Sequence, residues 1–129
     1  MQKKILVVDD EAPIRSLLER AFQDSEYELQ TIGSAETALE LIRKDNFQVF
    51  YLDLLLPKMN GLDLCVQIKK IRPTAFVFAM TGYASVFDLV KCREVGFDDY
   101  FPKPFDINDI KKATDEAFGK IERWRKNGG

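Results

Sequence analysis

Three acidic residues stand at the ends of two short apolar runs. Asp9 and Asp10 follow the apolar residues 5–8, and Asp53 follows the apolar residues 49–52. An apolar run of this length is typical of a strand that is buried on both faces of a sheet. Because an ionised carboxylate inside such a strand is costly unless it is paired or bound to a metal, we expect these acids at the strand ends.

Two further polar residues accompany apolar runs later in the chain. Thr81 comes directly after residues 75–80, and Lys103 lies within residues 100–105. Taken singly, an acid after a strand is usually a helix cap or a loop residue. Thr81 could likewise be an ordinary strand-end hydroxyl, and Lys103 a surface lysine. Their chemistry becomes distinctive only if the fold brings them together.

A cluster of these five side chains would have the composition of a site for phosphoryl transfer. Clustered carboxylates repel and raise one another's pKa, and a divalent cation relieves that repulsion. Oxygen ligands without imidazole or thiolate favour Mg²⁺ over zinc. A carboxylate beside Mg²⁺ can attack phosphorus to form an aspartyl phosphate. The ammonium of Lys103 and the hydroxyl of Thr81 could then neutralise the phosphoryl oxygens.

The elements that must position these residues alternate along the chain. We expect strands at about residues 5–8, 27–32, 47–53, 75–80 and 100–105. Each is followed by an amphipathic helical pattern, at about residues 13–22, 35–44, 61–72, 86–95 and 106–124. This alternation predicts an α/β fold in which a parallel sheet has helices on both faces. All strands of such a sheet end at one edge, where ligands bind, so the acids, Thr81 and Lys103 should converge there.

Local signals predict helix ends, an edge strand and a packed face. Ser34 should cap the second helix, and Ser85 with Asp88 should form a reciprocal cap on the fourth. Pro102 cannot donate to a ladder, which favours an edge position for the fifth strand. The last helix is expected to pack through one face, made of Ile110, Thr114, Ala117, Ile121 and Trp124.

The composition limits the classes of protein to consider. The chain has 129 residues, of which 46% are hydrophobic, a formal net charge of −2 and no histidine. We therefore expect one globular domain at residues 1–121, followed by a helix end and a frayed tail at residues 122–129. Histidine-based catalysis is excluded, and direct nucleic-acid binding is not indicated.

No segment of the sequence indicates export or membrane insertion. The apolar run near the N-terminus is too short for a signal peptide, and no run approaches the roughly 18 residues of a membrane span. Cys65 and Cys92 are therefore expected to be buried, reduced thiols. These features predict a cytoplasmic protein that does not bind membranes.

Over nearly its whole length, the chain resembles a receiver domain of a two-component response regulator, of the chemotaxis-regulator type. Four motifs carry the resemblance, and they are specific only together and in this order: Val7-Val8-Asp9-Asp10-Glu11, Asp53 with Pro57 and Gly61, Met80-Thr81-Gly82-Tyr83, and Lys103-Pro104-Phe105. The resemblance implies a flavodoxin-like sheet of five parallel strands in the order 2-1-3-4-5.

The resemblance also implies a role for each acidic residue. Asp53 would be the phosphoacceptor. Asp10 and Asp53 would bind Mg²⁺ directly and Asp9 would bind it through water, while the backbone carbonyl of Leu55 would be a further ligand.

A second set of residues would report the arrival of the phosphoryl group. Thr81 and Lys103 would hold it, and Tyr100 would swing inward when the threonine moves, although a single aromatic residue on a strand is more often a core residue. The Lys103–Pro104 peptide bond would be cis. The implied partners are a sensor histidine kinase or phosphotransfer protein, and a downstream effector or a second copy that binds the face of the fourth helix, fifth strand and fifth helix.

Two other interpretations and one departure remain. A Mg²⁺-dependent phosphatase with an aspartate nucleophile would have a second acid two residues after the nucleophile, where this chain has Leu55. A pseudo-receiver, which binds partners without phosphorylation, would not need the full acidic set. The apolar Leu55, together with Tyr83, could hinder an attacking water, which leads to the hypothesis of slow self-dephosphorylation.

Overall fold

A parallel sheet forms the centre of the molecule. The computed structural model describes residues 2–82 and 85–128, and its strands pair in the order β2-β1-β3-β4-β5. All pairings are parallel. The α/β class and the strand order are therefore confirmed. The strands are β1 Lys4–Val8, β2 Glu28–Ile32, β3 Val49–Asp53, β4 Phe76–Thr81 and β5 Asp99–Pro102.

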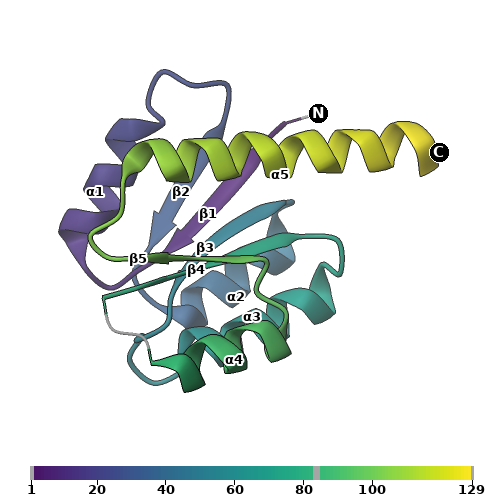
Figure 1. Ribbon diagram of the computed structural model, residues 1–129. Coiled ribbons are helices and arrows are strands. Elements are labelled where there is room, and N and C mark those ends of the chain that lie inside the picture. The colour runs from purple at the N-terminus through teal and green to yellow at the C-terminus, as the bar shows by residue number, and fades with distance from the viewer. Residues whose placement is uncertain (1, 83–84, 129) are drawn as a thin grey trace.

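Helices follow the strands and cover both faces of the sheet (Figure 1). On one face lie α2, α3 and α4, and on the other lie α1 and α5. No helix in the described part of the chain combines the length and the apolar character that crossing a membrane requires. The helices are α1 Ala12–Ala21, α2 Ala35–Lys44, α3 Gly61–Ile71, α4 Val86–Val95 and α5 Ile107–Gly128.

The central strand β3 contributes to both halves of the core. Successive side chains of a strand point to opposite faces of the sheet. Phe50 and Leu52 accordingly lie in the cluster with α2, α3 and α4, whereas Val49 and Tyr51 lie in the cluster under α1 and α5. All five residues of β3 are buried, so its only charged residue, Asp53, sits at the last position of the strand.

Short-range signals place the helix ends. The Ser34 side chain caps α2, and Ser85 and Asp88 form a capping box at the start of α4, both as predicted. Asn60 caps α3 through its side chain, which the sequence analysis did not anticipate. Each of these side chains satisfies a backbone N–H that has no partner within its helix.

The fifth strand is shorter than expected. β5 is an edge strand, as Pro102 predicted, but it ends at Pro102 rather than at residue 105. The Lys103–Pro104 peptide bond is cis, as the resemblance implied. Lys103 therefore lies in the loop directly after β5, at the same edge of the sheet as the ends of β1 and β3.

The last helix, α5, is longer than the part of the sheet on which it packs. It is helical as far as Gly128, and the C-terminal part of α5 extends past the strands (Figure 1). The prediction that Trp124 lies on the packed face is wrong, because its side chain is 78% exposed. The helical period continues the apolar stripe beyond the point where the sheet can cover it.

Both cysteines are free and buried, as predicted. Burial raises the pKa of the Cys65 thiol to about 12, and burial also raises the pKa of Cys92. Thiols of this kind are not ionised near neutral pH, so they act as small apolar core residues rather than as reactive groups.

Candidate functional site

Three carboxylates meet at the C-terminal edge of the sheet. β1 and β3 are neighbours in register, with Val8 opposite Leu52, so Asp9, which follows β1, lies beside Asp53, the last residue of β3. One carboxylate oxygen from each of Asp9, Asp10 and Asp53 can be chosen such that all three lie within 4.8 Å of one another. The structure thus brings together the three acids that the sequence placed at two strand ends.

Backbone hydrogen bonds hold two of these carboxylates in fixed orientations. Oδ1 of Asp9 accepts a hydrogen bond from the N–H of Glu11 at 2.8 Å, and Oδ1 of Asp53 accepts one from the N–H of Leu55 at 3.1 Å. Both acids are buried, while Asp10 is exposed. In each buried acid, Oδ1 accepts a hydrogen bond from the backbone N–H two residues later in the chain. The other oxygen, Oδ2, is the one that lies near the Lys103 ammonium.

Lys103 supplies the positive charge of the site. Its Nζ lies 2.8 Å from Oδ2 of Asp9 and 3.5 Å from Oδ2 of Asp53, with the exposed Glu11 carboxylate 3.6 Å away. Its backbone N–H donates to the carbonyl oxygen of Thr81 at 2.7 Å, which ties the loop after β5 to the end of β4. Lys103 follows β5, which lies on the other side of β4 from β3. Its ammonium therefore reaches across the end of β4 to the acids at the ends of β1 and β3.

The pKa values reflect a partly compensated cluster of negative charge. Burial raises the pKa of Asp53 to about 6, and the nearby carboxylates of Asp9 and Asp10 contribute to the rise. The Leu55 N–H and the Lys103 ammonium oppose it. For Lys103, burial favours the neutral form, but the contact with Asp9 and the charges of Asp9, Asp53 and Glu11 together outweigh burial, so the pKa of Lys103 is raised. One ammonium does not fully compensate the acids.

The other predicted residues that the structure describes lie at the end of β4, in β5 and in the loop after β3. Thr81 is buried at the end of β4, one residue after Met80, which is the register partner of Asp53. Tyr100 is half-buried in β5 and packs against the core on the α2, α3 and α4 side. The Leu55 side chain is 65% exposed beside Asp53. Tyr83 lies outside the residues that the structure describes.

Two contacts in the site were not found from the sequence. Arg15 in α1 donates from Nη1 to the carbonyl oxygen of Asp9 at 2.8 Å, which fixes the chain where it leaves β1. Glu11 was singled out only as an acid of the first motif, and its N–H orients Asp9. A helical arginine that turns back to a backbone carbonyl leaves no signal in residue spacing.

The loop from β3 to α3 passes very close to Asp53. The N–H of Gly61 donates to the Leu54 carbonyl at 3.1 Å. A Cβ atom at Gly61 would lie 2.4 Å from the carbonyl oxygen of Asp53 and 2.9 Å from Cα of Leu54. Only glycine permits this approach between two backbones. Gly61 was predicted as a helix start, and the structure shows that it also allows α3 to begin against the end of β3.

The acidic cluster fits a hard divalent cation. Its donors are carboxylate oxygens from three residues, which is the ligand chemistry that Mg²⁺ prefers. Within the described residues, the buried Oδ2 of Asp9 accepts no hydrogen bond of regular geometry, although it is ion-paired with Lys103. Such an atom can accept a hydrogen bond from a water molecule of a hydrated ion. The set of acids is that of a magnesium site in receiver domains.

The chain belongs to the response regulator receiver domain family, whose model matches residues 5–115. The family and the acidic cluster with Lys103 together define a phosphorylation-activated signalling domain of two-component systems. Such a domain accepts a phosphoryl group as a regulatory device and is not a true enzyme, so the alternative of a phosphatase is not supported.

Individual relatives agree with this assignment. The chain is 36% identical over 122 residues to the alkaline phosphatase synthesis transcriptional regulatory protein PhoP of Bacillus subtilis, which covers 95% of the chain and 51% of PhoP. A CheY-like receiver domain protein from Methanospirillum hungatei is 31% identical with a TM-score of 0.84, covering 93% of this chain and 99% of that one. The BeF3-activated DrrB receiver domain is 29% identical with a TM-score of 0.85, covering 92% and 99%.

The curated relatives are longer than this chain. The matched region spans between 24% and 53% of their length. What the relatives do through their other parts is therefore not transferred to this chain.

The close approach of Gly61 to Asp53 makes a specific prediction about stability. Gly61→Ala should destabilise the protein by about 1–3 kcal/mol, because the added Cβ forces two backbone segments apart. Urea unfolding followed by circular dichroism measures the change.

Gly119→Ala is the matched control. Gly119 lies inside α5, and a Cβ there meets only the flexible Arg123 side chain, at 3.6 Å from Nη1. This variant should gain up to about 1 kcal/mol, because alanine is the better helix former. Equal stability of Gly61→Ala and the native protein would show that the β3–α3 contact is not as tight as described.

Proposed function

We propose that Asp53 is the phosphoacceptor of this receiver domain and that a phosphohistidine of a sensor kinase or phosphotransfer protein is the donor. An oxygen of the Asp53 carboxylate forms a bond to phosphorus while the bond from phosphorus to the histidine nitrogen breaks, and the imidazole leaves. The observation that carries the proposal is the convergence of Asp53 with Asp9 and Asp10 within 4.8 Å, beneath the Lys103 ammonium.

Within this proposal the acids hold Mg²⁺ next to the acceptor. Asp10 and Asp53 would be its direct carboxylate ligands, Asp9 would bind it through water, and the backbone carbonyl of Leu55 would be a further ligand. When bound, the ion would supply positive charge that offsets the negative charge of the carboxylates and the phosphoryl group. The Leu55 N–H already holds Oδ1 of Asp53, so the carboxylate is oriented before any phosphoryl group arrives.

The switch begins with a change of partner for Lys103. Its ammonium is bound to Asp9 and close to Asp53, and a phosphoryl group on Asp53 offers three further acceptor oxygens at the same place. Thr81, buried at the end of β4, provides a hydroxyl to the same group. Tyr100 then repacks in β5, and a pre-existing equilibrium shifts toward the active form.

The surface that reports the switch is formed by α4, β5 and α5. An effector protein or a second copy of the chain binds there, and the domain proper is residues 1–121. The support is that Lys103 and Tyr100 both belong to the β5 segment between α4 and α5. The partners are proteins, without direct binding to nucleic acid or membranes. Two buried reduced thiols are consistent with a cytoplasmic location.

Phosphorylation can be tested without the kinase. Incubation of the native protein with Mg²⁺ and acetyl phosphate should add one phosphoryl group, detected as intact mass. EDTA should abolish the gain, because the carboxylates then repel the incoming phosphate.

Asp53→Asn is the variant for this test, since it keeps the size of the side chain but removes the nucleophilic carboxylate. It should show no gain in mass. Modification of Asp53→Asn to the native extent would rule out Asp53 as the acceptor, and no modification of the native protein would favour a pseudo-receiver.

The lifetime of the phosphorylated form should be long. An exposed apolar Leu55 beside Asp53 offers no polar group to orient an attacking water. We expect a half-life of minutes or more, measured by the decay of the phosphorylated mass after removal of acetyl phosphate. Leu55→Asn should shorten it by roughly tenfold, which corresponds to about 1.4 kcal/mol of barrier. A native half-life of seconds would refute the hypothesis.

A further inference from the structure

A buried hydrogen-bonded group lies outside the acidic cluster. Four polar or charged side chains are buried among the described residues, and three of them, Asp9, Asp53 and Thr81, belong to the site. The fourth is Thr114 in α5. Its Oγ1 lies 2.6 Å from the hydroxyl of Tyr51 in β3, which is fully buried as well.

The hydrogen bonds of this group are complete. The two hydroxyls have one hydrogen each. One hydrogen forms the bond between Tyr51 and Thr114, and the other is donated to the backbone carbonyl oxygen of Ile110, which lies 3.1 Å from the Tyr51 oxygen and 2.8 Å from Oγ1 of Thr114. The arrangement joins the interior of β3 to one turn of α5. Removal of the Tyr51 hydroxyl would break the side-chain hydrogen bond between β3 and α5 and leave the Thr114 hydroxyl bound only to the Ile110 carbonyl of its own helix.

Tyr51 stands directly behind the proposed phosphoacceptor. Residues two apart in a strand point to the same face of the sheet, about 7 Å apart. Tyr51 and Asp53 are therefore consecutive side chains on the face that α1 and α5 cover. The same strand, β3, therefore contains both the proposed phosphoacceptor and the tyrosine that contacts α5.

Aromatic contacts connect the same tyrosine to β5. The ring centroid of Tyr51 lies 5.0 Å from that of Phe78 in β4 and 6.1 Å from that of Phe101 in β5, and Phe78 and Phe101 are 5.9 Å apart. Phe101 precedes Lys103 by two residues. A displacement of Lys103 toward a phosphoryl group would pull on the segment that ends in Phe101, and Phe101 packs on Tyr51.

Hydrogen bonds and apolar contacts position a helix differently. α5 packs on the sheet through apolar side chains such as Ile110 and Phe118, and apolar contacts have little directional preference. A hydrogen bond is directional, so the contact with Thr114 fixes the rotation and the axial position of α5 relative to β3.

We propose that Tyr51 is a positioning residue that couples α5 to the phosphoacceptor strand, through its hydroxyl at Thr114 and its ring contact with Phe101. It carries the switch to the α5 part of the output surface, whereas Tyr100 faces the α4 side. The inference rests on the proposed role of Asp53.

The experiment compares amide hydrogen exchange with Mg²⁺ alone and with Mg²⁺ plus beryllofluoride, a phosphoryl mimic. In the native protein the mimic should change exchange in β5 and in residues 107–118 of α5. In Tyr51→Phe the change in β5 should persist, while the change in α5 should fall by roughly three- to tenfold, the range expected for loss of one buried hydrogen bond. Thr114→Val leaves the Tyr51 hydroxyl its bond to the Ile110 carbonyl of α5, so it should reduce the change in α5 by less than Tyr51→Phe does and add little to Tyr51→Phe in the double variant.

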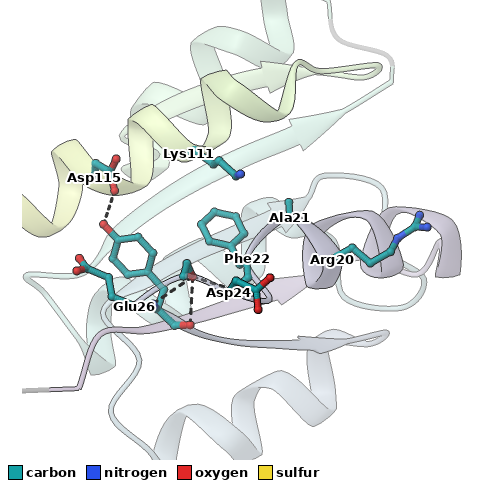
Figure 2. A pocket seen from close by; sticks show the side chains of 9 residues that line it. Arg20, Ala21, Phe22, Asp24, Glu26, Lys111 and Asp115 are labelled. Carbon is teal, nitrogen blue, oxygen red and sulfur yellow. Dashed lines mark hydrogen bonds between the residues drawn. The ribbon is translucent and has the colours of Figure 1, made fainter.

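Tyr27→Phe is the matched control. Tyr27 also binds α5 through its hydroxyl, which donates to the carboxylate of Asp115 at the rim of a cavity of about 640 Å³ near the C-terminal end of α1 (Figure 2). It does not belong to β3. The response of α5 to beryllofluoride should therefore remain native in Tyr27→Phe.

The outcomes separate this inference from the proposed function. A native α5 response in Tyr51→Phe, or an equal loss in Tyr27→Phe, would overturn the role of Tyr51 and leave the phosphoacceptor unaffected. If the native protein shows no response to beryllofluoride in any segment, the proposed function fails and the inference fails with it.

Discussion

The arrangement of the molecule depends on like charges that are held together at one edge of the sheet. Asp9, Asp10 and Asp53 approach within 4.8 Å, and Lys103 is the one ammonium paired with them in the described structure. Such a cluster is unfavourable by itself: burial is the main cause of the raised pKa of Asp53, and the charges of Asp9 and Asp10 add to it. It persists because the buried strands β1 and β3 fix the positions of the carboxylates. The repulsion between the carboxylates favours binding of a cation at this site.

The rest of the fold serves to hold this edge and to connect it with the surface. Two backbone N–H groups orient the carboxylates of Asp9 and Asp53. Gly61 lets α3 begin against the end of β3. The Lys103 N–H donates to the Thr81 carbonyl, so the residue that carries the positive charge of the site is attached to both β4 and β5. Changes at the site can thus reach β5 and α5 over short distances.

Much of this could be predicted because the signals are local or periodic. Asp53 had to end its strand, since a buried strand tolerates a charge only there. The caps at Ser34 and Ser85 depend on residues three positions apart. The strand order came from the family resemblance. By contrast, Tyr51 and Thr114 are 63 residues apart, and nothing in either segment signals their contact. Trp124 was misplaced because helical period does not reveal where the sheet ends.

The central claim is that the three acids form one cation site, and Mg²⁺-dependent stability tests it most directly. Thermal unfolding should be measured with and without Mg²⁺ for the native protein and for Asp10→Asn. A tenfold excess of Mg²⁺ over its dissociation constant should stabilise the native protein by about 1.4 kcal/mol, and the same concentration should have little effect on Asp10→Asn. An equal shift in both proteins, or none in the native one, would contradict the account.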